Sequence, residues 1–425
     1  MNKNNTLVWQ LKRDLLKFAE KLSDGLTRPK MKFLSDMLYG LLVSQSIMLT
    51  EIGRALQESI SYKKTEDRLS RNLKEFRQEI ECVRQNYLET AKPLVDDDTI
   101  FCIDPGDITK RYSRRQEGLG WIWDGSDHKT ALGWNLYEVT ALTHKKKLPI
   151  PVYMQVVSPE DYVSEGQTEE ILDAIRATQQ AFGNVGTYNM DRGMDADAIY
   201  EHCFDTKQRF NIRSKVNRRL VVGAEILETS EIAKKMKGKY RIDYTDKHGN
   251  KHILKVSFQA VRLPSRPDEA LTLVMVYGYD KDEPMLLLTN LPIQGKQTCL
   301  RVVKTYLCRW RIEEHYRFQK NQFELENIRV LSMDSICSLV FILTVLSGWI
   351  AMFANKRGES LLLEEVLSRA KRLHGIPQFT LYAVADGIYD ILKSATKGIQ
   401  AAFFKKTRSQ QLSLFKPGVI NLCAA

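Results

Sequence analysis

Apolar residues recur every three or four positions along residues 1–95, the spacing that places them on one face of an α-helix. A largely apolar stretch runs from Met37 to Leu49, and a charged stretch follows from Tyr62 to Arg84. We therefore expect a helical N-terminal region. Five basic residues in the charged stretch form either a DNA-contacting surface or an ordinary solvated helix face: Lys63, Lys64, Arg68, Arg71 and Lys74.

Beyond residue 95 the helical spacing gives way to short apolar runs that are bounded by turn residues. These runs predict strands at 99–103, 134–142, 149–157, 185–190 and 210–214. Helical spacing within the same part predicts helices at 167–182 and 195–204. Three strands followed by helix, strand, helix and strand indicate an α/β fold in which helices flank a mixed sheet.

Residues 216–290 depart from this rhythm. Two strand-like runs, 239–246 and 251–263, are joined by His248-Gly249-Asn250 and predict a β-hairpin. Further strands are expected at 271–279 and 284–290, so we interpret this segment as an all-β insertion in the α/β core. Its basic residues form either a DNA track or a solubilising edge: Lys234, Lys235, Lys237, Lys239 and Arg241.

The helical pattern returns at Thr298 and predicts one long helix over 299–323. The apolar segment 336–353 has the minimum length of a membrane span, but it contains Ser338, Thr344 and Ser347 and has no second span beside it. We expect a buried core helix there, and a helical tail that ends in the basic segment 405–408. The expected domains are a helical DNA-binding domain (1–95), two core parts (96–215 and 296–375), the β insertion between them (216–295) and a helical C-terminal region for dimerisation (376–425).

Charge and cysteine content narrow the class of partner and compartment. The net charge is +11, and Lys and Arg displace the counterions of nucleic acid, so a basic chain favours phosphate-rich partners. The seven cysteines are odd in number and form no C-x-x-C pair, which argues against a zinc ribbon and a disulfide framework. With no signal-peptide pattern at the N-terminus, we expect a reducing, cytoplasmic location and no membrane.

Three acidic residues are candidates for metal-dependent phosphodiester chemistry. Asp104 and Asp191 follow predicted strands, where sites of open α/β sheets form, although an aspartate there is usually a turn or cap residue. Glu313 shares a helix face with Tyr306, Arg309 and Lys320, unless Arg309 and Glu313 are only a surface i,i+4 pair. Carboxylates suit two Mg²⁺ or Mn²⁺ ions, beside which Arg309 and Lys320 would hold phosphates.

These residues resemble a known family. The spacing Tyr306-x2-Arg309-x3-Glu313-x6-Lys320 is similar to the Y-x2-R-x3-E-x6-K signature (YREK) of bacterial insertion-sequence transposases of the IS-four type. Asp191-Arg192-Gly193-x-Asp195 resembles the family's second-aspartate motif, and Phe210-Asn-Ile-Arg213-Ser-Lys215 resembles the basic strand after it. The resemblance covers roughly residues 60–350. It leaves Asp107 as an alternative to Asp104, because both lie in Asp104-Pro-Gly-Asp107.

The resemblance implies an RNase H-like core with a DDE triad, in which Asp104, Asp191 and Glu313 hold the metals. It implies further that these residues contact DNA: Tyr306, Arg309, Lys320, Arg192, Arg213 and Lys215. The expected activity is cut-and-paste transposition through a hairpin, by a homodimer that bridges terminal inverted repeats and joins them to target DNA on the bacterial nucleoid. The family's base-flipping aromatic has no assignable counterpart, since residues 216–290 contain no Trp. The alternatives are a nuclease without strand transfer and an inactive transposase-derived DNA-binding protein.

Overall fold

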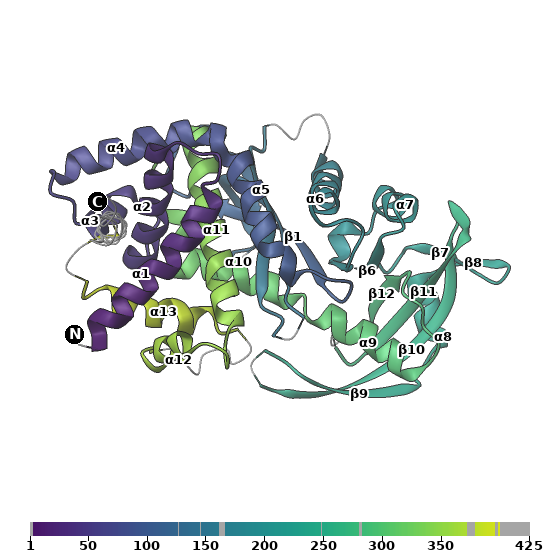
Figure 1. Ribbon diagram of the computed structural model, residues 1–425. Coiled ribbons are helices and arrows are strands. Elements are labelled where there is room, and N and C mark those ends of the chain that lie inside the picture. The colour runs from purple at the N-terminus through teal and green to yellow at the C-terminus, as the bar shows by residue number, and fades with distance from the viewer. Residues whose placement is uncertain are drawn as a thin grey trace, which may run out of the picture.

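The computed structural model describes residues 3–125, 127–144, 146–160, 166–247, 249–279, 283–371, 379–395 and 398–399. Within them, a 12-stranded, mostly antiparallel mixed sheet runs through the molecule in the order β2-β3-β1-β5-β6-β12-β11-β10-β7-β8, with β4 paired to β3 and β9 to β10. In Figure 1 a helical lobe stands at the left and the outer strands of the sheet at the right. The expected mixed α/β fold is confirmed.

The core half of the sheet places the candidate aspartates. In it β1 (Ile100–Thr109), β3 (Lys129–Leu142) and β4 (Pro149–Val157) are antiparallel neighbours. Next to β1, β5 (Thr187–Met190) and β6 (Arg209–Arg213) run parallel to it, and α6 (Gly166–Phe182) and α7 (Asp197–Asp205) connect them. The order of these strands is β4-β3-β1-β5-β6, and each strand and helix predicted here is observed, although β1 ends six residues later and β3 begins five residues earlier than expected.

The turn expected after residue 103 is absent, because β1 continues through Asp104-Pro105-Gly106-Asp107 to Thr109. Its antiparallel partner β3 stays paired along the whole length, from Ile100↔Leu142 to Thr109↔Gly133. Its parallel partner β5 leaves after Cys102↔Asn189. Pro105 has no N–H to donate and lies where only one neighbouring strand remains, a position at which a strand tolerates proline. The sequence signal for a turn was therefore overridden by pairing with β3.

The segment 216–290 continues the core sheet. The predicted hairpin is β9 (Tyr240–Thr245) with β10 (Lys251–Leu263), followed by β11 (Arg266–Tyr277) and β12 (Met285–Thr289). β12 pairs with the core strand β6, so the insertion extends the core sheet. The expectation of an all-β segment is wrong, because β7 (Arg219–Val222) and β8 (Glu225–Glu228) are followed by α8 (Thr229–Lys235).

The single long helix expected over 299–323 is also wrong, since the chain forms α9 (Lys296–Leu307) and α10 (Trp310–Gln322). At the junction, the N–H groups of Cys308 and Arg309 donate three residues back, to Thr305 (3.2 Å) and Tyr306 (2.9 Å). The Thr305 carbonyl also accepts the amide of Asn189 on β5 at 2.6 Å. This polar side chain from the sheet competes for the carbonyl and tightens the turn, which separates the two helices.

The helical lobe surrounds α11 (Met333–Asn355), which is apolar enough to cross a membrane but has 89% of its most apolar window buried inside the protein. α2 and α3 together are apolar as well, and they are bent by 99°. The prediction of a buried core helix at residues 336–353 is therefore confirmed. The helices around it are α1 (Lys3–Leu22), α2 (Arg28–Ser44), α3 (Leu49–Leu56), α4 (Tyr62–Glu75), α5 (Ile80–Ala91), α12 (Leu361–Ser368) and α13 (Leu381–Leu392). The predicted basic segment 405–408 lies outside the described residues.

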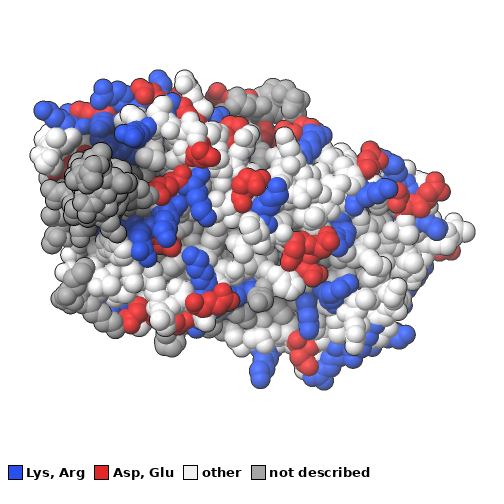
Figure 2. All heavy atoms as spheres, viewed as in Figure 1, with Lys and Arg blue, Asp and Glu red and all other residues white. Residues whose placement is uncertain are grey.

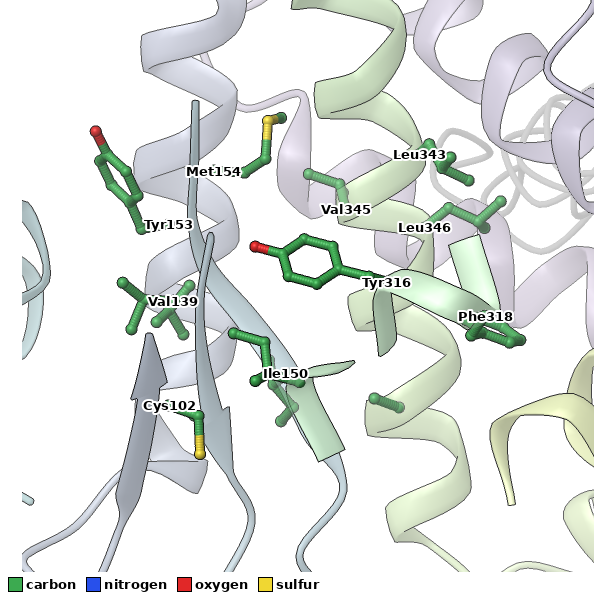
Figure 3. Packing of buried hydrophobic residues seen from close by; sticks show 14 of the residues in the cluster. Cys102, Val139, Ile150, Tyr153, Met154, Tyr316, Phe318, Leu343, Val345 and Leu346 are labelled. Atoms are coloured by element: carbon green, nitrogen blue, oxygen red, sulfur yellow. The ribbon is translucent and has the colours of Figure 1, made fainter. Parts of the chain in front are cut away.

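α10 and α11 pack against the core strands. Figure 3 shows the Tyr316 ring of α10 reaching between the strands and α11, with Leu346 of α11 beside it. Buried residues of the strands, among them Cys102, Val139 and Ile150, belong to the same cluster. This packing holds α10, and with it Glu313, over the end of β1.

A close fit also ties the helical lobe to the core. The Tyr87 hydroxyl of α5 donates to the carbonyl of Pro151 on β4 at 2.8 Å. A Cβ at Gly348 of α11 would lie 1.9 Å from that hydroxyl oxygen, so α11 approaches α5 this closely only with glycine there. α5, α11 and β4 therefore meet at one point where no larger residue fits.

Candidate active site

Strand register brings three of the predicted residues to one level of the sheet. The parallel pairs Cys102↔Asn189 of β1 and β5 and Met190↔Ile212 of β5 and β6 are the last before each β5 pairing ends. Continued by one or two residues, this register sets Asp104, Asp191 and Arg213 side by side. β5 and β6 end at this level, where sites form in such sheets, whereas β1 continues to Thr109, so Asp104 lies in mid-strand where its parallel pairing stops.

The junction of α9 and α10 lies over this edge and adds a phenol, a guanidinium and a third carboxylate. The Tyr306 hydroxyl donates to Asp191 Oδ1 at 3.2 Å. Arg309 lies between two acids, with Nη1 3.4 Å from Asp104 Oδ2 and Nη2 2.5 Å from Glu313 Oε1. The i,i+4 pair of Arg309 and Glu313 therefore forms, with the arginine largely buried against the sheet edge and the Glu313 side chain 39% exposed. We call Asp104, Asp191, Arg309 and Glu313 the Asp104 cluster.

The acids of the Asp104 cluster are close enough to change each other's ionisation. Burial raises the pKa of Asp104 to about 7; Arg309 opposes the rise, and the negative charges of Glu313 and Asp191 add to it. Burial also acts to raise the pKa of Asp191, but Arg309, the Arg192 backbone N–H and Arg213 outweigh it and the pKa is lowered. Three acids thus compete for one buried cation.

The donor set of the Asp104 cluster suits a divalent metal ion. As the side chains stand, no three His, Cys, Asp or Glu residues within the described ranges are close enough to hold a metal ion. The guanidinium of Arg309 lies among the acids: burial acts to lower its pKa, and Asp104 is the foremost of the groups that raise it instead. With all three acids ionised, the cluster carries two negative charges in excess of Arg309. Carboxylate oxygens are the ligands that Mg²⁺ and Mn²⁺ prefer, so charge and chemistry both fit such an ion.

Lys320, the remaining residue of the predicted helix face, forms its ion pairs outside the Asp104 cluster. Lys320 Nζ lies 2.7 Å from Asp107 Oδ2 and 3.0 Å from Glu326 Oε1, and Glu326 also accepts the Thr109 hydroxyl at 2.9 Å. We call Asp107, Lys320 and Glu326 the Asp107 cluster. Asp104, and not Asp107, is the aspartate that shares a cation with Glu313. Lys320 links α10 to β1 through its ion pair with Asp107.

The second-aspartate motif contributes a scaffold as well as a candidate ligand. Asp195 is buried and accepts the Tyr200 hydroxyl and the Lys215 backbone N–H, both at 2.7 Å, and it forms an ion pair with Arg218. These bonds fix the loops after β5 and β6 together. Of the predicted DNA contacts in these loops, the Lys215 side chain is exposed and Arg192 is half-buried.

A pocket of about 300 Å³ adjoins the Asp104 cluster, and its aromatic lining was not predicted. Arg213, Tyr306, Arg309 and Glu313 form one side of it. The other side comes from Tyr244, His252 and Tyr279 of the β9–β11 region, with Trp310 of α10. The absence of Trp from residues 216–290 concealed this lining, because tyrosines and a histidine in strands look like ordinary sheet residues.

The basic side chains singled out in the sequence differ in whether they form ion pairs or are exposed. Arg68 of α4 is paired with Asp36 at 3.1 Å and Glu58 at 2.9 Å, so it holds helices together. The other basic side chains of that stretch are exposed: Lys63, Lys64, Arg71 and Lys74. Figure 2 shows Lys and Arg gathered over α4 and along the β9–β10 edge, interspersed with Asp and Glu. Both surfaces are accessible to a polyanion.

Comparison with known proteins adds two findings. The sequence model of the family described as Transposase DDE domain matches residues 96–347, more than half of the chain. The chain is also similar to a cryo-EM structure of the piggyBac transposase synaptic complex with hairpin DNA, at 11% identity and a TM-score of 0.46, covering 100% of this chain and 87% of that one. No curated protein matches.

Proposed function

Because the chain belongs to the family of the transposase DDE domain, we propose that it is a DNA transposase that cuts DNA at transposon ends and joins those ends to target DNA. The observation that carries the proposal is the Asp104 cluster, in which Asp104 and Glu313 share the Arg309 guanidinium and Asp191 lies beside them. Phosphodiester cleavage and strand transfer use such a group of acids to bring metal ions to the reacting phosphate.

In this proposal Asp104, Asp191 and Glu313 hold two Mg²⁺ or Mn²⁺ ions. Bound ions would activate water or a 3′-hydroxyl and stabilise the leaving oxygen. Arg309, which the carboxylates hold here, would bind a DNA phosphate once those carboxylates held metal ions, because guanidinium binds phosphate oxygens as readily as carboxylate oxygens. Tyr306 keeps Asp191 in place through its hydroxyl. Arg213, Lys215 and Arg192 lie at the ends of β5 and β6 to receive the DNA backbone.

The proposed transposase subtype, core fold and domains follow from the sequence resemblance. We propose that Tyr306, Arg309, Glu313 and Lys320 are the YREK residues of an insertion-sequence transposase of the IS-four type, on an RNase H-like core. The strand order β4-β3-β1-β5-β6, with β1, β5 and β6 parallel, supports such a core. The proposed domains are those expected from the sequence, with residues 1–95 binding DNA and residues 376–425 pairing two chains.

The reaction steps, the partners and the cellular location are also proposed from the sequence resemblance. The partners are terminal inverted repeats and target DNA, held by a homodimer in the bacterial cytoplasm. Cleavage of one strand would release a 3′-hydroxyl that attacks the opposite strand to form a hairpin. The pocket beside Glu313 has space and aromatic walls for an unpaired base that such a rearrangement exposes.

Two assays separate this function from its alternatives. The full-length protein is incubated with Mg²⁺ and duplexes taken from both flanks of its gene, and separately with pre-cut ends and a target plasmid. A transposase gives strand breaks at the ends and joined products, and Asp191→Asn binds the ends but gives neither. Breaks without joined products indicate a nuclease. End binding without breaks, in Mn²⁺ as well, indicates an inactive derivative and overturns the proposal.

A further inference from the structure

The β2–β3 hairpin displays two tryptophans to solvent. Along β2 (Gly120–Asp124), Ile122 and Asp124 point inward and are 4% and 1% exposed, whereas Trp121 and Trp123 point outward and are 72% and 60% exposed. The outward positions of an antiparallel strand that faces water are ordinarily polar. Two large apolar rings side by side at such positions indicate a surface that a partner covers.

The segments next to β2 in the chain expose apolar side chains as well. Tyr112, in the loop that leads into β2, is 98% exposed, and Leu331 is 59% exposed. The Glu117 backbone N–H donates to the Leu331 carbonyl at 2.9 Å, which ties the loop to the segment before α11. Tyr112 and Leu331 line a hollow of about 610 Å³ together with Arg329. Besides the two rings on β2, the loop before β2 and the segment tied to that loop each expose one large apolar side chain.

The charge around the rings is positive. Arg114 and Arg115 of the same loop are exposed and form no ion pair with the described residues. The nearby acids, by contrast, are engaged. Asp127 pairs with Arg111 at 2.6 Å and with Lys129 at 2.8 Å, and Asp124 lies 3.4 Å from Arg111. The free charge beside the tryptophans is therefore cationic, which suits a phosphate-bearing partner.

The hairpin lies at the rim of the candidate active site. A Cβ at Gly125, in the turn after β2, would lie 3.8 Å from Asp107 Oδ1. Asp107 is bound to Lys320, which lies about two turns along α10 from Glu313 on the same helix face. A DNA strand whose phosphate reaches the Asp104 cluster would thus pass close to β2.

We propose that Trp121 and Trp123 stack on unpaired bases of the DNA strand next to the scissile phosphate, with Arg114 and Arg115 holding its phosphates. This inference rests on the proposed function. Bases within a duplex are already stacked on one another, so aromatic side chains take up bases that are unpaired, and they do so with little regard to sequence. A second copy of the chain is a poorer occupant, because a symmetric contact would oppose the same arginines across the interface.

The test compares two DNAs by fluorescence anisotropy: a blunt duplex, and the same duplex with a short unpaired flank. The full-length protein is expected to bind the flanked DNA about tenfold more tightly, since stacking supplies that much per base or more. The double variant Trp121→Ala/Trp123→Ala should lose this preference and keep its affinity for the blunt duplex. Phe at both positions should retain part of the preference. Trp9→Ala is the matched control, because Trp9 is a 37% exposed tryptophan on α1.

Each outcome decides between the claims. A preference that survives in the double variant, or a wild-type protein that binds both DNAs equally, overturns the stacking role and leaves the transposase proposal standing. A wild-type protein that binds neither DNA removes both. If the double variant keeps its DNA preference but loses self-association in sedimentation, the tryptophans are an interface between copies. Both alanines replace exposed side chains, so the melting temperature should match that of the wild type, which shows that folding is intact.

Discussion

The Asp104 cluster and the Asp107 cluster both join β1 to the region of α10, and each places one cation between acids, but the Asp104 cluster also contains Asp191, which follows β5. They differ in balance. The Asp104 cluster has three carboxylates for one arginine, and burial and repulsion raise the pKa of Asp104 to about 7. The Asp107 cluster has two carboxylates for one lysine, and a threonine hydroxyl satisfies one of them.

The excess of carboxylates over cations distinguishes an ion cluster that can bind a ligand from one that only links two elements. In the Asp107 cluster, burial acts to lower the pKa of Lys320, but Asp107 and Glu326 outweigh burial and raise it, and one carboxylate is in excess of the ammonium. In the Asp104 cluster two carboxylates are in excess of the guanidinium, and the pKa of Asp104 is raised to about 7. Excess buried charge costs stability, and a chain keeps it where a ligand of opposite charge is bound.

The largest expected difference is in catalysis. Glu313→Gln should slow strand cleavage by about a thousandfold or more, because it removes a carboxylate from the metal-binding group. Glu326→Gln, the matched change in the Asp107 cluster, should slow it by less than about threefold. Initial cleavage rates in Mn²⁺ measure both, and anisotropy checks that both variants still bind DNA. Similar rates for the two variants would erase the distinction between the clusters.

The next difference concerns stability and its recovery by metal. Arg309→Gln leaves three acids without their cation and should lower the free energy of unfolding by about 3–5 kcal/mol in EDTA. Mn²⁺ should restore most of that loss, because an ion that binds only the folded protein stabilises it. Lys320→Gln should also destabilise the protein, but Mn²⁺ should restore nothing. Urea unfolding with and without Mn²⁺ gives the four values, and equal recovery in both variants would contradict the assignment.

A pH profile isolates Asp104. Its folded pKa of about 7 lies above its ordinary value of 3.8, so between these values the folded protein binds the additional proton. This contribution to stability is complete below about pH 4 and is lost as the pH rises to 7. Without metal, the wild type should lose about 2–3 kcal/mol between pH 5 and 8 relative to Asp104→Asn. The comparison of the two unfolding curves cancels the other titrating groups, and parallel curves would exclude the raised pKa.

The smallest effect tests the satisfied cluster. Thr109→Val removes the hydroxyl that donates to Glu326 and should cost about 1 kcal/mol of unfolding free energy. It should leave the cleavage rate in Mn²⁺ within about twofold of the wild type. A tenfold loss of rate would show that the Asp107 cluster takes part in the reaction.

Much of the fold was predictable because α6 and β10 carry periodic apolar positions and β4 is a continuous apolar run of the right length. Besides α8, three features were not. β1 passes through a proline and a glycine because β3 holds its other edge. The break between α9 and α10 depends on Asn189, more than a hundred residues away in the sequence. β2 was missed because it is short and turns tryptophans outward.

Some residues of the candidate site could likewise be predicted from the sequence, and others could not. Tyr306, Arg309 and Glu313 were predicted from fixed spacing, and the junction of α9 and α10 keeps them on one side. Lys320 fits the same spacing, but its partner Asp107 lies on another element, and no local pattern shows such pairing. The aromatic lining of the pocket beside Glu313 depends on how the β9–β10 hairpin folds back, where Lys247 lies 3.9 Å from Glu314 of α10. Long-range contacts of this kind are invisible to periodicity.

The fit of Gly348 against Tyr87 has a mechanical consequence. Because no spare volume separates α11 from Tyr87, a shift of α5 against α11 or β4 would cost packing and the hydrogen bond to Pro151. A duplex gripped by the helical lobe would meet the carboxylates after a path of set length. The close packing at Gly348 would then set the distance between a recognised sequence and the position at which the strand is cut.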